Sequence, residues 1–182
     1  MALSPRNFSS NRDCSNLCIA EKSRQMSGDS EMGEGIYWSI EGQLDLAKFE
    51  QFVGKVNHVL ETTTVVLSGT DPFDMEPVCN NEIVYINGFA FNSSEPLIIR
   101  RVFPYADNFC KTRRHHYSKA VVAIVLLLKD TFPDQVAGLS CDVPREIVER
   151  GYNIAREFSD TVDISWLSSE ISFQRLAQLS LS

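Results

Sequence analysis

A run of nine apolar residues, Ala120 to Leu128, places the strongest constraint on what this chain can fold into. Residues at the spacing of one helical face precede and run through it: Tyr117, Val121, Ile124 and Leu128. Apolar residues also cover much of the remaining circumference, so the helix is expected to be nearly enclosed by other elements. The run is less than half as long as a membrane-spanning helix requires, which indicates the buried helix of a globular domain.

The rest of the pattern alternates short strands with helices. Strands are predicted at 36–40, 62–67, 82–91, 97–102, 135–140 and 162–167, and helices at 44–60, from Pro144 to 158 and near 173–177. The segment 92–96 is short enough to make a hairpin of the strands on either side. Antiparallel hairpins mixed with helices predict an α+β fold, a two-layer sandwich with helices packed on one face of a mostly antiparallel sheet.

The first 33 residues differ in composition from the remainder. They are rich in Ser, Asn and Arg and show no sustained periodicity, so they bury too little apolar surface to offset the entropy of ordering. We therefore predict a disordered N-terminal tail over 1–33 and a single α+β domain over 34–182.

Positive charge is concentrated in one segment of an acidic chain. Residues 100–119 hold six Lys or Arg against Asp107 alone, a net of +5, which leaves −12 for the rest of a chain of total charge −7. The acidic balance argues against a protein that binds nucleic acid or an anionic membrane by bulk charge. Nor is there a nucleic-acid motif with interleaved aromatic residues, so a nucleic-acid partner is not expected.

The basic segment leads into the apolar run, where we predict the start of a helix. Cations at that point face the positive end of the helix dipole and repel one another, which an anion would turn into attraction. Arginine also binds phosphate and carboxylate with paired hydrogen bonds. The hypothesis is a pocket for an anionic ligand, phosphate or carboxylate, or for an acidic protein surface, formed by Arg101, Lys111, Arg113 and Arg114.

A simpler interpretation assigns no function to the cluster. The cations would then pair with carboxylates of the acidic remainder, or solvate the exposed start of a buried helix. A third possibility is a structural subunit of a larger assembly. Tyr37 and Trp38 are consecutive in a predicted strand, so one of them must point away from the core and is available for an interface.

Cys110 supports an enzymatic alternative, a small cysteine-dependent hydrolase or transferase. Cations and helix amides lower the pKa of a thiol, and Cys110 immediately precedes the predicted helix. His116 or His115 would then act as the base, oriented by Asp142 or Asp107. Only proximity in sequence supports the arrangement, so we expect a non-enzymatic binding protein.

The cysteines indicate the compartment. Their number is odd, and no apolar block at the N-terminus indicates export, which predicts free thiols in a cytoplasmic protein. They are Cys14, Cys18, Cys79, Cys110 and Cys141. No spacing predicts a metal site, and the classical nucleotide-binding, hydrolase and zinc-protease motifs are absent from the sequence, so neither a metal nor a cofactor is expected.

Overall fold

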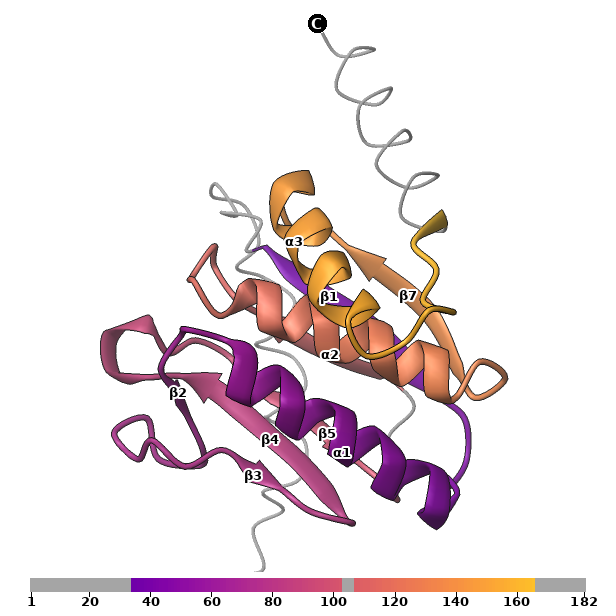
Figure 1. Cartoon of the computed structure of the whole chain (residues 1–182). Helices are drawn as coiled ribbons and strands as arrows, with labels where there is room; N and C mark the ends of the chain where they lie inside the picture. The colour runs from indigo at the N-terminus through magenta and orange to yellow at the C-terminus, as the bar shows by residue number, and fades with distance from the viewer. Residues whose placement is uncertain (1–33, 103–106, 166–182) are drawn as a thin grey trace, which may run out of the picture. The chain divides into compact units, whose positions relative to one another are not determined.

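The computed structural model describes residues 34–102 and 107–165 and shows an α+β fold built from antiparallel sheets. The elements follow in the order β1 (Gly35–Ile40), α1 (Leu46–Thr62), β2 (Leu67–Ser68), β3 (Val78–Cys79), β4 (Ile83–Gly88), the 3-10 turn η1 (Ala90–Asn92), β5 (Leu97–Arg100), β6 (Asp107–Lys111), α2 (Ser118–Thr131), β7 (Val136–Cys141) and α3 (Arg145–Arg156). Figure 1 shows α1 and α2 lying across the strands, with α3 against α2.

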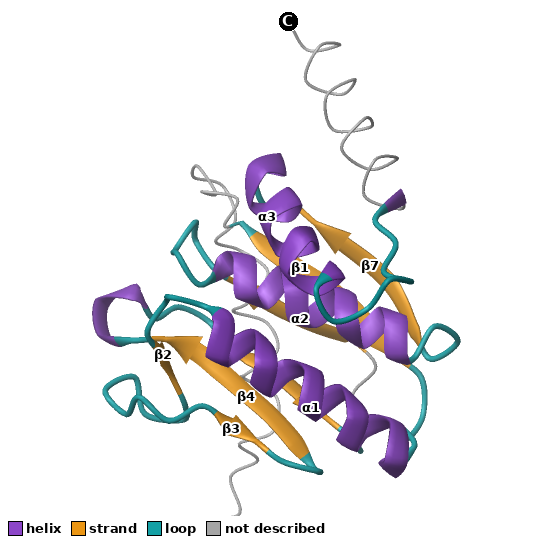
Figure 2. Cartoon of the chain, viewed as in Figure 1, coloured by secondary structure: helices purple, strands orange, loops and turns teal. Residues whose placement is uncertain are grey.

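The strands form two antiparallel groups. In one group β1 is central and pairs with β6 and β7, and in the other β4 pairs with β2, β3 and β5. A hydrogen bond from Glu95 N to Lys111 O joins the segment before β5 to the end of β6. The three helices of the described residues lie on one side of the strands, as Figure 2 shows, so the two-layer arrangement predicted from the sequence is confirmed.

The apolar helix is enclosed, as its composition predicts. Every residue of α2 from Ala120 to Leu128 is buried, because β7, α1 and α3 all pack against it. The helix α1 buries a narrower stripe and is capped at its start by Asp45, whose carboxylate accepts a hydrogen bond from Lys48 N at 2.9 Å. The stripe comprises Phe49, Phe52, Val53, Val56 and Val59.

The structure corrects the prediction at the start of α2. Residues 107–111 form a strand, β6, and residues 112–117 form turns, so the helix begins only at Ser118. The pairing of Gly35 with Lys111 and of Ile36 with Cys110 explains the strand, because β1 supplies a backbone partner from more than 70 positions earlier. The basic residues before Ser118 therefore do not lie at a helix N-terminus.

Smaller differences concern the ends of other predicted elements. Residues 63–66, predicted as strand, are irregular, because α1 continues to Thr62 and β2 pairs over only two residues. Of the strand predicted at 162–167, the described part, 162–165, is not a strand. The predicted tail at 1–33 and the helix near 173–177 lie outside the described residues. Trp38 is buried, so of the two consecutive aromatics only the half-buried Tyr37 reaches the surface, where it stacks on Phe109.

Candidate functional site

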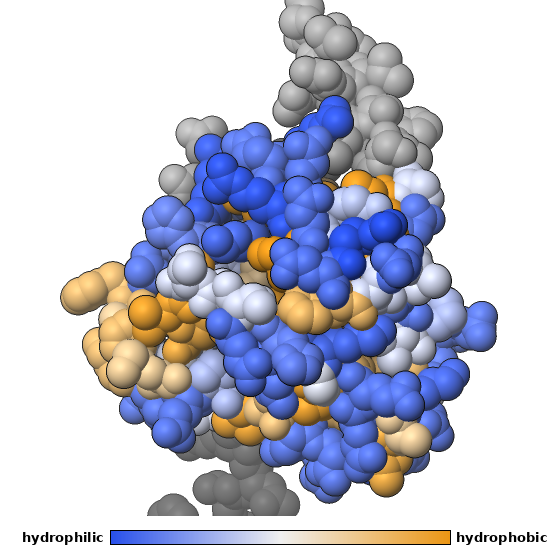
Figure 3. Space-filling view, viewed as in Figure 1, coloured by the Kyte–Doolittle hydropathy of each residue, from blue (hydrophilic) through white to orange (hydrophobic). Residues whose placement is uncertain are grey.

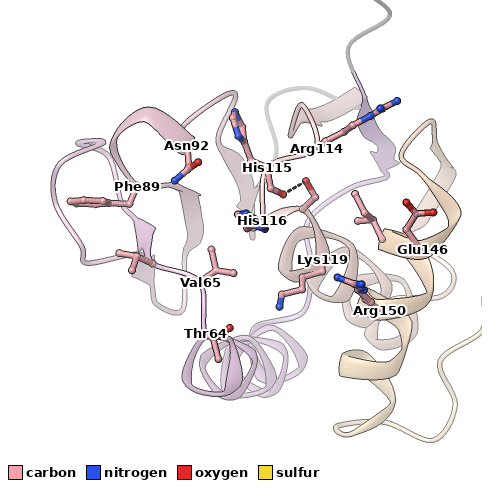
Figure 4. A pocket seen from close by; sticks show the side chains of 13 residues that line it. Thr64, Val65, Phe89, Asn92, Arg114, His115, His116, Lys119, Glu146 and Arg150 are labelled. Atoms are coloured by element: carbon pink, nitrogen blue, oxygen red, sulfur yellow. Dashed lines mark hydrogen bonds between the residues drawn. The ribbon is translucent and has the colours of Figure 1, made fainter.

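A pocket of about 560 Å³ opens between the turn that precedes α2, the start of α3 and the segment leading into β2 (Figure 4). This is within the range of small-molecule sites. Its lining is mostly polar and carries three permanent cations against one carboxylate: Thr64, Val65, Val66, Phe89, Asn92, Arg114, His115, His116, Ser118, Lys119, Glu146, Ile147 and Arg150. The pocket therefore has a positive character on a chain whose total charge is negative.

Tight packing of α2 against α3 brings Lys119 and Arg150 to the same side of the pocket. Gly151 has no side chain, and a Cβ atom there would lie 2.5 Å from Val122 Cβ and 2.8 Å from the carbonyl oxygen of Lys119. The backbone next to Arg150 thus touches the backbone of Lys119, and Figure 4 shows the two side chains near each other. Within the described residues neither cation forms an ion pair with a carboxylate.

The N-terminal turns of α2 and α3 both line the pocket. The pocket is lined by Ser118 and Lys119 from the first turn of α2 and by Glu146 from the first turn of α3. Neither helix has a side chain that caps its first amides, because their N-cap residues are Tyr117 and Pro144. The positive ends of the two helix dipoles therefore add to the charge of the side chains.

The turn that carries the histidines is held in an uncommon backbone conformation. Arg113 and Arg114 have φ angles of 47° and 60°, in the left-handed region that non-glycine residues seldom adopt. The carbonyl oxygen of Glu34 accepts hydrogen bonds from Thr112 N at 2.9 Å and from Arg113 N at 3.4 Å. Glu34 immediately precedes β1, so these two hydrogen bonds attach the turn to the start of that strand.

The second half of the same turn leads directly into α2. His115 N donates to Thr112 O at 2.9 Å, and His115 O accepts from Ser118 N at 2.9 Å and from Ser118 Oγ at 2.6 Å. The ring of His115 stacks on Tyr117, with centroids 6.1 Å apart, whereas His116 is exposed and lines the pocket. The hydrogen bonds therefore set both imidazoles at the pocket while leaving the ring of His116 open to solvent.

The structure separates the four cations that the sequence grouped together. Of these, Arg114 lines the pocket, but its Nε donates to the carboxylate of Glu34, and Figure 4 shows its side chain directed away from the centre. Arg113 is exposed on the turn, outside the pocket lining. Lys111 lies on β6, with its Nζ 6.0 Å from the centre of the Phe109 ring.

Arg101 follows the C-terminal end of β5, whereas Lys111 is hydrogen-bonded to the segment before β5. Because Glu95 is hydrogen-bonded to Lys111, Arg101 is six residues along the chain from that contact, about 20 Å in extended backbone. It borders a separate hollow of about 310 Å³ together with Glu82, Ile83, Arg100 and Val102. The predicted convergence of Arg101 with the other three cations is therefore not seen.

Cys110 does not meet the conditions that a nucleophilic thiolate requires. It lies within β6 rather than before a helix, is fully buried, and donates its thiol hydrogen to Glu95 O at 3.2 Å. Burial raises the pKa of the Cys110 thiol far above its usual range, and the charge of Glu95 adds to the effect. The thiol is therefore protonated at neutral pH.

The other members of the predicted triad have different partners. Asp142 accepts a hydrogen bond from Gly35 N, on the side of β1 opposite to β6. Cys110 and Asp142 are thus separated by one intervening strand, about 10 Å by the usual strand spacing. His116 lines the pocket, whereas neither Cys110 nor Asp142 does, so the structure does not bring the three residues together.

Sequence reasoning missed the two cations that lie together. Lys119 belongs to the basic segment but not to the pocket predicted from the sequence, and Arg150 is 31 positions farther along the chain. The available signal was Gly151, a glycine inside the apolar stripe of a predicted helix. Such a residue indicates a close approach of another backbone and makes its neighbours candidates for a shared surface.

Comparison of the chain with protein-family models, curated proteins and solved structures found no match. Among residues 34–102 and 107–165, no cluster of three or more His, Cys, Asp or Glu side chains is arranged to hold a metal ion. None of the helices in the same residues is both long and apolar enough to cross a membrane.

Proposed function

We propose that the protein is a non-enzymatic binding protein that holds an anionic ligand, a phosphate or carboxylate group, between Lys119 and Arg150. The observation that carries the proposal is the contact at Gly151, which holds at a pocket two cations that pair with no carboxylate of the described residues. Like charges held together repel each other, and an anion placed between them reverses the sign of that interaction.

The surroundings of the two cations favour an anion that also accepts hydrogen bonds. The exposed His116 and the hydroxyl-bearing Thr64 line the same pocket. Arg150 offers the planar guanidinium that binds phosphate or carboxylate with two parallel hydrogen bonds, and Lys119 adds a compact charge. Phosphate is favoured over a single carboxylate, because its greater negative charge balances the charges of both cations.

The proposed site is formed by other residues than the anion pocket predicted from the sequence, but it depends on the same effect, an anion that offsets positive charge at the start of a helix. Lys119 lies in the first turn of α2, where its charge faces the positive end of the dipole. A cation at that position is unfavourable for the helix alone, and a bound anion would offset the cost. The enzymatic alternative with Cys110, His116 and Asp142 gains no support from the observed geometry.

Calorimetric titration of the full chain with inorganic phosphate at low ionic strength tests the proposal. Arg150→Ala is expected to weaken binding by about tenfold or more, the usual effect of losing a charge-assisted hydrogen bond. Arg156→Ala is the matched control, because Arg156 is on the same helix, lies outside the pocket lining and carries the same charge. Equal affinities of the two variants, or no binding by the wild type, would refute the proposal.

A further inference from the structure

Exposed apolar side chains gather around η1, next to the pocket. Of the seven large hydrophobic residues that are exposed in the described chain, four lie in η1 or in the segments near it. They are Val66, Phe73, Met75 and Phe91, exposed by 49, 70, 63 and 96%. Figure 3 shows hydrophobic surface at the left edge of the molecule, where η1 lies in Figure 2. Apolar groups clustered in this way indicate an interaction surface.

This apolar ridge, defined by those four residues, lies between surfaces of opposite charge. On one side Val66 and Asn92 line the basic pocket. On the other side Ala90 N donates to Pro72 O at 2.8 Å, which ties η1 to the loop 69–77. That loop carries three acids, Asp71, Asp74 and Glu76, and no described Lys or Arg forms an ion pair with any of them.

We propose that the ridge is the contact surface of a symmetric dimer, in which the acidic loop 69–77 of each copy docks at the basic pocket of the other. A two-fold axis through the ridge places each loop opposite the partner copy's pocket. In a single interface, the acidic loop and the basic pocket of each copy then both meet a surface of opposite charge. The inference rests on the proposed function in one respect, since the same pocket attracts negative charge. Here the negative charge belongs to a second copy of the chain.

The aromatic residues on the ridge supply the apolar part of such a contact. Phe91 protrudes from η1 and Phe73 from the acidic loop, and both lie one residue from the hydrogen bond between Ala90 and Pro72. Aromatic side chains at the centre of an interface, surrounded by complementary charges, are the arrangement that dominates binding energy in protein pairs. Apolar contacts between the two ridges stabilise the dimer, and the charges determine which surfaces meet.

Sedimentation of the full chain at low salt, from micromolar to millimolar concentration, tests the dimer through a charge exchange. One variant reverses the loop, Asp74→Lys with Glu76→Lys, and the other reverses the pocket, Lys119→Glu with Arg150→Glu. Each variant alone is expected to be monomeric, whereas their equimolar mixture is expected to form dimers, because every loop then faces a pocket of opposite charge. A wild type that stays monomeric, dimers that survive either reversal, or a mixture that stays monomeric would overturn the proposal.

Two further measurements keep the result interpretable. Phe91→Ser changes a side chain that is 96% exposed, so folding is unaffected, and it is expected to weaken the dimer by about tenfold or more. Unchanged dimer affinity in this variant would contradict the role of the ridge. The loop variant keeps every residue of the pocket lining, so it is expected to bind phosphate as a monomer. A wild type that binds phosphate but stays monomeric would uphold the proposed function and overturn the dimer.

Discussion

The packing of α2 against α3 predicts that Gly151→Ala destabilises the protein, although the same change usually stabilises a helix. Alanine in place of glycine within a helix gains about 1 kcal/mol. The added Cβ would lie 2.5 Å from Val122 Cβ and Cγ1, whereas carbon atoms in contact are usually about 3.5–4.0 Å apart. The helices must therefore separate by about 1 Å, because the third neighbour, the carbonyl oxygen of Lys119 at 2.8 Å, is backbone and does not turn aside.

The magnitude follows from the balance of these two effects. Overpacking of this kind costs about 1–3 kcal/mol, and its upper range applies because backbone atoms are in contact. After the gain in helix propensity, we expect Gly151→Ala to lower the free energy of unfolding by about 1–2 kcal/mol. The displacement should also weaken phosphate binding, since it moves Arg150 away from Lys119.

The matched control is Gly54→Ala, in the middle of α1, where an added Cβ meets no atom within 4 Å. That variant is expected to gain about 1 kcal/mol. Thermal unfolding monitored by circular dichroism should therefore separate the two melting temperatures by about 4–12 °C, from a scale of about 2–4 °C per kcal/mol at this size. If Gly151→Ala melts at or above Gly54→Ala, the close contact between the helices is refuted.

Three further outcomes follow from the described contacts. Burial alone would raise the pKa of Asp130, but hydrogen bonds from Thr161, Ser159 and Lys55 outweigh it and lower the pKa. The stability that Asp130 supplies is then present at neutral pH and lost as the pH falls below about 4, so Asp130→Asn should cost about 2 kcal/mol at pH 7 and much less in acid; equal cost at both pH values in urea titrations would contradict this. Cys110 should resist alkylation of the folded protein at neutral pH, and peptide mapping that finds rapid labelling would contradict its burial. Arg113→Gly should raise stability by up to about 1 kcal/mol by relieving the positive φ, and a loss of stability in thermal unfolding would show that the arginine side chain matters more than the backbone.

Elements whose signal is local agree with the sequence-based predictions. The helices α1 and α2 follow from the spacing of their apolar residues, and the β4–β5 hairpin follows from two apolar runs joined by a short polar segment. The strand β6 does not follow in this way. Its residues, Asp107 to Lys111, are mostly polar or charged, and they form a strand because β1 offers a backbone edge from a distant part of the chain.

The site was harder to predict than the fold for the same physical reason. A cluster of adjacent cations looked like a site, yet successive residues of a strand and a tight turn point in different directions. Only Arg114 of that cluster reaches the pocket lining, and Glu34 partners it. The two cations that lie together come from separate helices, joined through a glycine contact that only the tertiary structure reveals.

The central claim is that Lys119 and Arg150 hold an anion between them. The most direct test is a crystal structure of the full chain grown or soaked with tungstate, a tetrahedral oxyanion whose position is located by anomalous scattering. We expect the tungsten peak about 4 Å from Lys119 Nζ and from the Arg150 guanidinium, so that oxygens of the anion lie within about 3 Å of both groups. A peak only at Lys111 or Arg101, or an Arg150 side chain folded onto Glu146 with no anion in the pocket, would contradict the account.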